Sequence, residues 1–163
     1  MADSLLIRKA EKKDSEIILY FINQLAKYEK LEHEVEATEE LIEKNIFGEG
    51  SNVEALICYR DDKPVAFAVY FYNFSTFLAK PGLYLEDIFV LPEMRGKGIG
   101  KKMLTHIAKI AVEKGCGRFE WAVLDWNEPA INFYKSIGAV PMDEWTIFRL
   151  TGEPLLRLAD SEN

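Results

Sequence analysis

The sequence predicts a mixed α/β fold: a mostly antiparallel sheet with one parallel strand pair and helices on both faces. Two apolar segments, 53–59 and 65–72, are separated by a short acidic turn, which is typical of an antiparallel hairpin. Segment 65–72 is apolar on both faces, so it predicts a central strand covered from both sides. A strand, a long amphipathic helix and another strand follow over 83–124, a unit that pairs its two strands in parallel.

The first elements follow from cap residues and helical periodicity. Ser4–Arg8 is short and apolar and predicts a strand. Asp14 then precedes a stripe at helical spacing, so we expect it to cap a helix. Thr38 starts a second, short helix that ends near Gly48. The stripe of the first helix consists of Ile17, Ile18, Phe21, Ile22 and Leu25.

The middle of the chain predicts three strands. Val53–Tyr59 and Val65–Tyr72 are joined by the turn Asp61-Asp62-Lys63. Lys80-Pro81-Gly82 is expected to break the chain before a third strand, Leu83–Val90.

The remaining elements alternate between helix and strand. Gly98–Lys114 predicts a helix, and Phe119–Leu124 predicts a strand. Asn127 is expected to cap a helix that reaches Ile137, with Pro129 in its first turn. Trp145–Leu150 predicts a last strand. The end of the chain, 152–163, is ambiguous, with a terminal helix over 152–159 as one reading.

Length and composition limit the classes of function. The chain has 163 residues, 48% of them hydrophobic, and no linker divides it, so we expect one domain over 1–163. The formal net charge of −7 argues against general nucleic-acid binding and suits a cationic small molecule as a partner. The longest apolar run, 65–72, is too short to span a membrane, and no signal peptide is predicted. Two cysteines cannot build a disulfide framework, so a cytoplasmic location is expected.

The sharpest local signal is the segment Arg95-Gly96-Lys97-Gly98-Ile99-Gly100-Lys101-Lys102. Its glycines let the backbone approach a ligand closely, and the free N–H groups of a helix start favour an anion. Four basic residues in an acidic chain strengthen the case for a phosphate-bearing ligand. The glycine spacing fits neither a dinucleotide fingerprint nor a P-loop. A glycine-rich turn with solvated lysines is the alternative.

Two further segments offer candidate catalytic groups. Glu86 and Asp87 are adjacent acids in an apolar strand, so they are expected on opposite faces, with a structural ion pair as the alternative to a function. Tyr134 lies on the helix that starts at Asn127, where packing in the core is the alternative. The two histidines have no metal-ligand spacing, so no metal site is expected.

Taken together, these segments resemble the motifs of a known enzyme family. Arg95-x-x-Gly98-x-Gly100 between a strand and a helix resembles the acyl-CoA pyrophosphate motif of the GNAT N-acetyltransferase superfamily, and the element order matches it. A closer resemblance, over almost the whole chain, is to the spermidine/spermine (diamine) acetyltransferase family, including its thialysine-acetylating branch. It is carried by Leu25-Ala26-Lys27-Tyr28-Glu29, Phe47-Gly48-Glu49, Tyr84-Leu85-Glu86-Asp87, Arg95-Gly96-x-Gly98-Ile99-Gly100, Trp126-Asn127-Glu128-Pro129 and Ile131-Asn132-Phe133-Tyr134-Lys135.

The resemblance implies a role for each matching residue. Tyr134 is the general acid for the CoA thiolate, and Glu86 binds the substrate amine or relays its proton. Cofactor contacts are implied for Ile88, Phe89, Val90, Arg95, Gly96, Lys97, Gly98, Ile99, Gly100, Lys101, Asn127, Glu128, Pro129 and Ala130. Substrate contacts are implied for Tyr28, Glu29, Glu86, Glu120, Trp121 and Ala122, and acid clusters that include Asp143 add to them. The family also implies a homodimer.

The predicted function is therefore transfer of acetyl from acetyl-CoA to a primary amine of a small cationic acceptor, by direct attack and without a metal. A polyamine, a diamine or a thialysine-like amino acid fits the acid clusters. The short turn at 61–63 departs from the animal polyamine enzymes, and Gly115-Cys116 and the segment 122–127 look closer to the thialysine branch. The alternatives are acetylation of a protein or peptide amine, and a CoA-binding sensor without turnover.

Overall fold

The computed structural model describes residues 4–161, and the chain forms two compact units divided between Ala122 and Val123. The expectation that residues 1–163 act as one domain stays a prediction. The first unit contains β1 (Leu5–Lys9), η1 (Lys12–Asp14), α1 (Ser15–Glu29), η2 (Glu32–Glu34), α2 (Glu39–Ile46), β2 (Val53–Arg60), β3 (Lys63–Ser75), β4 (Lys80–Val90), η3 (Pro92–Met94), α3 (Ile99–Glu113) and β5 (Phe119–Trp121). The second unit contains α4 (Glu128–Ser136) and α5 (Gly152–Ala159).

The sheet of the first unit has five strands in the order β1-β2-β3-β4-β5. All neighbours are antiparallel except β4 and β5, which are parallel, so the predicted mixture is confirmed. The turn between β2 and β3 uses Asp61 at φ 49° and Asp62 at φ 62°, the left-handed pair that a two-residue hairpin requires. Strand β3 lies in the middle and is buried over most of its length, as its two apolar faces predict.

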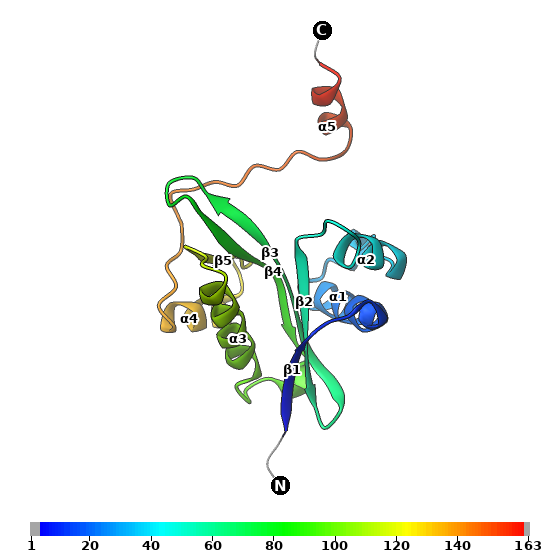
Figure 1. Ribbon diagram of the computed structural model, residues 1–163, viewed down its shortest axis with the longest axis vertical. Helices are drawn as coiled ribbons and strands as arrows, with labels where there is room; N and C mark the ends of the chain where they lie inside the picture. The colour runs from blue at the N-terminus through cyan, green and yellow to red at the C-terminus, as the bar shows by residue number, and fades with distance from the viewer. Residues whose placement is uncertain (1–3, 162–163) are drawn as a thin grey trace. The chain divides into compact units, whose positions relative to one another are not determined.

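Helices cover both faces of this sheet, with α1 and α2 on one face and α3 on the other (Figure 1). On the first face Phe21 of α1 stacks on Phe67 of β3, with ring centroids 5.1 Å apart and both side chains fully buried. On the other face α3 buries one stripe that begins at Ile99 and continues through Met103, Leu104, Ile107 and Ala111. The sheet therefore has buried side chains on each of its two faces.

The cap of α1 differs in detail from the prediction. Asp14 is the N-cap residue, but its side chain does not cap the helix. Its carboxylate instead accepts from the backbone N–H of Glu11 at 2.8 Å and from both terminal nitrogens of Arg8. Arg8 and Glu11 hold the pKa of Asp14 below its usual value, so this buried carboxylate stays charged. Thr38, by contrast, caps α2 as predicted, because its Oγ1 accepts from the N–H of Leu41.

The predicted break at Lys80-Pro81-Gly82 is wrong, because these residues begin β4. Strand β3 continues to Ser75 and gives them a backbone to pair with, so that Pro81 lies opposite Phe74. A Cβ at Gly82 would collide with Oδ1 of Asn73, so the glycine permits a close approach inside a strand instead of ending one. Strand β5 is shorter than predicted and ends at Trp121.

The second unit does not contain the strand predicted over Trp145–Leu150, because residues 123–161 form no strand. A strand needs a neighbouring backbone to accept its hydrogen bonds, and the described part of the second unit offers no other strand to this segment. Its apolar side chains are accordingly open, with Phe148 93% exposed. The ambiguous end of the chain resolves as α5, with an ion pair between Arg157 and Glu153 at 3.2 Å. Among residues 4–161 no helix has the length and apolar character needed to cross a bilayer.

Candidate active site

The glycine-rich segment forms a loop that leads from β4 into α3. Gly96 and Gly98 adopt φ of 74° and 77°, and Gly98 is the residue that caps α3. A Cβ built on either glycine would meet no atom within 4 Å, so the surface over the loop is clear. The first turn of α3 therefore presents its backbone N–H groups beside an open loop, which suits a negatively charged group.

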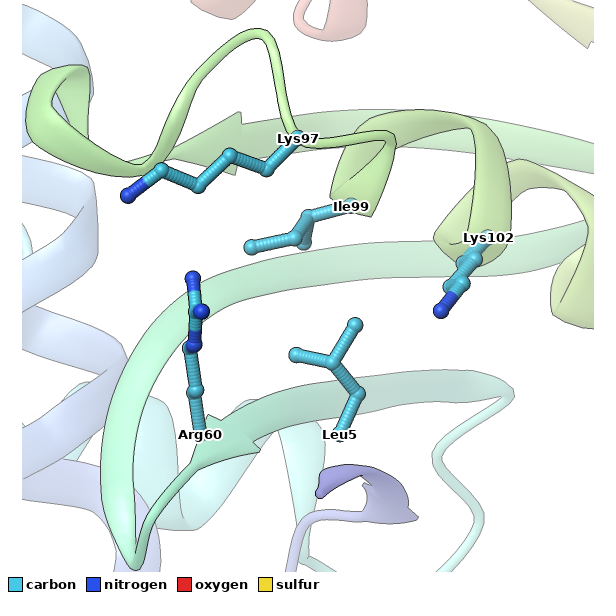
Figure 2. A pocket seen from close by; sticks show the side chains of 5 residues that line it. All are labelled: Leu5, Arg60, Lys97, Ile99 and Lys102. Carbon is cyan, nitrogen blue, oxygen red and sulfur yellow. The ribbon is translucent and has the colours of Figure 1, made fainter. Parts of the chain in front are cut away.

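A small basic pocket lies beside this loop (Figure 2). Leu5 and Arg60 are opposite each other on β1 and β2, and Arg60 extends toward the loop that carries Lys97. Lys102, from the first turn of α3, completes the basic lining, and Ile99 fills the base as a buried side chain. Sequence reasoning singled out Lys97 and Ile99 but not Leu5 and Arg60, because β1 and β2 are distant from the loop in the chain.

Strand β4 carries an irregularity at its candidate catalytic residue. Leu85 lies opposite Tyr70 and Asp87 opposite Val69, so Glu86 has no partner on β3 and forms a bulge. The extra residue interrupts the regular alternation of side chains, and the prediction that Glu86 and Asp87 point to opposite faces stays a prediction. An acidic pair within an apolar strand gives no sign of a bulge in the sequence.

The other edge of β4 is open beyond the bulge. Strand β5 pairs with β4 only over Leu83–Leu85, opposite Phe119–Trp121. From Glu86 to Val90 no strand of the described residues pairs with this edge, although β4 continues to Val90. Ile88, Phe89 and Val90 thus present backbone groups along a free edge, the arrangement to which an extended ligand adds by β-type pairing.

Three carboxylates gather around the bulge. Burial, followed by the charges of Glu86 and Glu29, raises the pKa of Asp87 from 3.8 to about 6. Glu29 is the last residue of α1, and burial raises its pKa as well. Glu29 and Glu86, both predicted site residues, thus each lie near enough to Asp87 for their charges to act on it, although 57 positions separate them in the sequence. Asp87 was singled out in the sequence as an acid in an apolar strand, but no contact with substrate or cofactor was predicted for it.

Arg95 contacts two further predicted site residues, Tyr28 and Phe89. Its Nε donates to the carbonyl of Val90 at 3.1 Å. Its guanidinium carbon lies 4.4 Å from the centre of the Tyr28 ring and 5.2 Å from that of Phe89. The two rings are 6.2 Å apart, so Arg95 links the end of α1 to the end of β4.

The remaining predicted residues of the first unit lie on β5 or directly after it. Glu120 pairs with Arg118, with 2.8 Å between Oε1 and Nε. The ring of Trp121 packs on Phe119 at 4.9 Å, and Ala122 follows the strand. These side chains are half-buried or exposed, and Glu120 already has a cationic partner.

The second unit holds Tyr134 and the predicted segment Asn127–Ala130. Asn127 precedes α4 as predicted, but only its backbone carbonyl bonds to the helix, accepting from the N–H of Ile131 at 3.0 Å. Tyr134 lies on α4, and its ring is 5.8 Å from that of Phe133. Asp143 is exposed in the irregular segment after α4. Among residues 4–161 no group of three or more His, Cys, Asp and Glu is placed to hold a metal ion.

Comparisons with known proteins agree with this arrangement. Residues 19–139 match the model of the acetyltransferase (GNAT) family. The chain is 40% identical to the thialysine N-epsilon-acetyltransferase of Sus scrofa over 96% of this chain and 98% of that one. It is 53% identical to the L-ornithine N5-acetyltransferase of Arabidopsis thaliana over 89 residues, 55% of this chain and 39% of that one. An integron cassette protein from V. cholerae superposes with a TM-score of 0.82 at 31% identity, over 97% of this chain and 99% of that one.

The family match covers strands β2 to β5, the glycine loop and α4, and the relative from Sus scrofa is covered almost from end to end. The predicted fold and the predicted class of enzyme are both confirmed by these matches. This chain belongs to the GNAT family of acetyltransferases.

Proposed function

We propose that this acetyltransferase moves the acetyl group of acetyl-CoA to a primary amine of a small cationic acceptor, such as a thialysine-like amino acid, ornithine or a polyamine. The observation that carries the proposal is the cluster of Glu29, Glu86 and Asp87, in which burial and mutual repulsion raise the pKa of Asp87. A cation placed among these carboxylates relieves that repulsion. The names of the relatives, thialysine and ornithine acetyltransferases, support the same class of acceptor.

The first unit offers two features that fit acetyl-CoA. The clear surface over Gly96 and Gly98 suits the pyrophosphate, which would be held by the backbone of 96–101. The free edge of β4 at Ile88–Val90 suits the pantetheine arm, whose amides pair as a strand does. Residues 127–130 would line the same co-substrate further along. When bound, acetyl-CoA supplies an electrophilic thioester carbonyl and a thiolate leaving group.

Removal of the amine proton is assigned to Glu86. A free alkylamine has a pKa of about 10.4 and arrives charged, whereas a glutamate has a pKa of about 4.3. A carboxylate of ordinary pKa is a poor direct base for such an amine, so we assign Glu86 to hold the ammonium while the proton leaves through water to solvent. The neutral nitrogen then forms the new bond to the carbonyl carbon as the carbon–sulfur bond breaks. Asp87 and Glu29 hold a second positive charge of the acceptor and fix its distance from the carbonyl.

Protonation of the leaving sulfur is assigned to Tyr134, and the proton that the nitrogen loses on becoming an amide restores the phenol. A phenol has a pKa of about 10 and a thiol a pKa of about 8.5, so a proton passes readily between them. The backbone N–H groups at the end of β4 polarise the carbonyl as charge develops on its oxygen.

The test is release of free CoA thiol with a panel of amines. Thialysine, L-ornithine and spermidine should be acetylated with a far lower KM than n-butylamine or a peptide with a free amino terminus, and kcat/KM should fall as salt rises. Glu29→Gln should raise the KM for the diamines much more than the KM for n-butylamine. Equal efficiency with monoamine and diamine contradicts the cationic acceptor, a preference for the peptide supports a protein substrate, and acetyl-CoA binding without any turnover supports a sensor.

We also propose a homodimer, with the second unit as the surface that a second copy covers. No residue of 123–161 is buried, and Ile147, Phe148 and Leu156 are among its exposed apolar side chains. An apolar surface of this extent on a folded chain marks an interaction site. Phe148→Glu should lower the mass measured by sedimentation from dimer to monomer, whereas the exposed Val112 of α3 serves as a control through Val112→Glu. A wild-type monomer at micromolar concentration contradicts the proposal.

A cytoplasmic location remains the proposed compartment, because both Cys58 and Cys116 are free thiols. The expectations of no nucleic-acid partner, no membrane partner and no metal stay predictions. They follow from the charge and spacing of the sequence.

A further inference from the structure

Arg95 is the first residue of the glycine-rich motif, yet its side chain turns back toward β4 and α1. It directly precedes Gly96, whose left-handed backbone begins the open loop. Three contacts fix its guanidinium: the 3.1 Å bond from Nε to the Val90 carbonyl and the two ring contacts with Tyr28 and Phe89. The guanidinium thus donates to a backbone oxygen while its central carbon lies over two aromatic rings.

The neighbouring carboxylates do not form ion pairs with Arg95 in the described part of the chain. No ion pair within the described residues joins Arg95 to an acid, although Glu29 directly follows Tyr28 in the chain. The charges that raise the pKa of Asp87 come from Glu86 and Glu29. Arg95 therefore leaves the negative charge of the cluster available to a ligand, and it combines one backbone hydrogen bond with two ring contacts, which suits a guanidinium better than an ammonium.

We infer that Arg95 is a positioning residue that couples the acceptor side of the site to the coenzyme side. The inference rests on the proposed function for the identity of the two ligands. Tyr28 belongs to the end of α1 that carries Glu29, and Val90 and Gly96 belong to the strand and loop proposed to hold acetyl-CoA. A shift of α1 on binding an amine is transmitted through the Tyr28 ring to Arg95, and from there to the loop backbone. Thermodynamic linkage requires the effect to act equally in the reverse direction.

The first experiment measures CoA affinity by calorimetry and needs no amine. Arg95→Lys keeps the charge but loses the planar contacts, and Tyr28→Leu removes the ring from the other side. Each should weaken CoA binding about fivefold, and the double variant should be no weaker than either single one. Tyr28→Phe keeps the ring and should bind CoA like the wild type. If Arg95→Lys fails to fold, the comparison of CoA affinity between Tyr28→Leu and Tyr28→Phe still tests the inference.

The second experiment adds thialysine at saturation. Wild-type protein should bind CoA about fivefold more tightly in its presence, and the gain should vanish in Arg95→Lys and Tyr28→Leu. Arg8→Lys is the matched control, because Arg8 lies over the ring of Tyr59 at 4.9 Å outside the site. That variant should lose thermal stability and keep the whole gain.

Unchanged CoA affinity in Tyr28→Leu, or single effects that multiply in the double variant, would overturn the inference and leave Arg95 as a phosphate ligand or a structural residue. A protein that neither binds nor acetylates thialysine contradicts the proposed acceptor instead. The CoA cycle still decides the role of Arg95 in that case.

Discussion

The two units of this chain are alike in their supply of apolar residues and opposite in what they bury. In the first unit Phe21, Phe67 and Tyr70 are among the side chains that lie below 2% exposure. In the second unit Trp145 is 75% exposed and Phe148 93%, and no residue of 123–161 is buried. Hydrophobic sequence therefore becomes core only where elements are present to close over it.

The comparison also separates the two halves of the proposed chemistry. The carboxylates, the open edge of β4 and the glycine loop belong to the unit that has its own core. Tyr134 and the segment 127–130 belong to the unit that does not. The unit with a core thus holds the carboxylates proposed to select the amine, while the proposed general acid lies on a helix of the unit that has no buried residue.

The largest expected effect compares two phenylalanines. Phe67→Ala removes a fully buried ring that stacks on Phe21 and should lower the free energy of unfolding by about 3 to 5 kcal/mol. Phe148→Ala removes a ring that is 93% exposed and should change the stability of the monomer by less than about 0.5 kcal/mol. Urea unfolding of both variants below the dimer concentration measures the difference. Similar losses would show that the second unit has a core after all.

The next effect concerns the second unit alone. Tyr134→Phe should lower kcat by about a hundredfold or more, the scale of one general acid, and leave acetyl-CoA affinity within about twofold. Steady-state kinetics and calorimetry give the two quantities. A Phe variant with full activity at every pH would assign the ring to packing against Phe133.

A third prediction uses the carboxylate cluster of the first unit. The pKa of Asp87 is raised to about 6, so the native state resists its ionisation. The associated stability is complete below about pH 4, where the unfolded chain is protonated too, and is lost as pH rises through about 6. Asp87→Asn should therefore be more stable than the wild type above pH 6, by about 1.5 to 3 kcal/mol, and equal to it near pH 3.

Unfolding curves of wild type and Asp87→Asn at intervals between pH 3 and pH 8 would test this, because carboxylates that do not interact with Asp87 cancel in the difference. A difference that does not vary with pH would place the Asp87 carboxylate in water.

The smallest effect separates backbone from side chain in the glycine loop. Gly98 has a φ of 77°, which a β-branched residue adopts only with strain of about 1 to 2 kcal/mol. Gly98→Val should therefore weaken CoA binding by about tenfold, whereas Lys102→Ala removes an exposed charge worth about 1 kcal/mol or less. If calorimetry ranks the two variants the other way, the phosphates are held by side chains of the basic pocket.

Most of the first unit was predictable from local pattern. The hairpin at Asp61-Asp62, the cap at Thr38 and the stripe of α3 follow from rules that act within a few residues. The predictions fail where the structure of a segment depends on pairing with another strand. Gly82 lies within a strand because β3 runs far enough to pair with it, and 145–150 is not a strand because no backbone pairs with it.

The candidate site also combines features that are local in sequence with features that depend on distant elements. The loop 95–101 and the acids at 86 and 87 are visible as motifs, because their chemistry is contiguous in sequence. The bulge at Glu86 depends on the register with β3, the gathering of Glu29 depends on where α1 ends, and the turned-back Arg95 depends on two rings from different elements. None of these three features can be read from the identity of the residue itself or of its neighbours in sequence.

The open edge of β4 has a consequence for how the protein behaves when it is concentrated. An unpaired strand edge is a template on which another chain can add, and flat apolar edges of this kind lead to aggregation. Here the free stretch begins at Glu86 with a bulge and two acids, the features by which natural sheets discourage such addition. The carboxylates proposed to select an amine are thus also expected to discourage the addition of another chain to this edge. Neutralising them should make the protein more prone to precipitate, and an occupied coenzyme site should protect it.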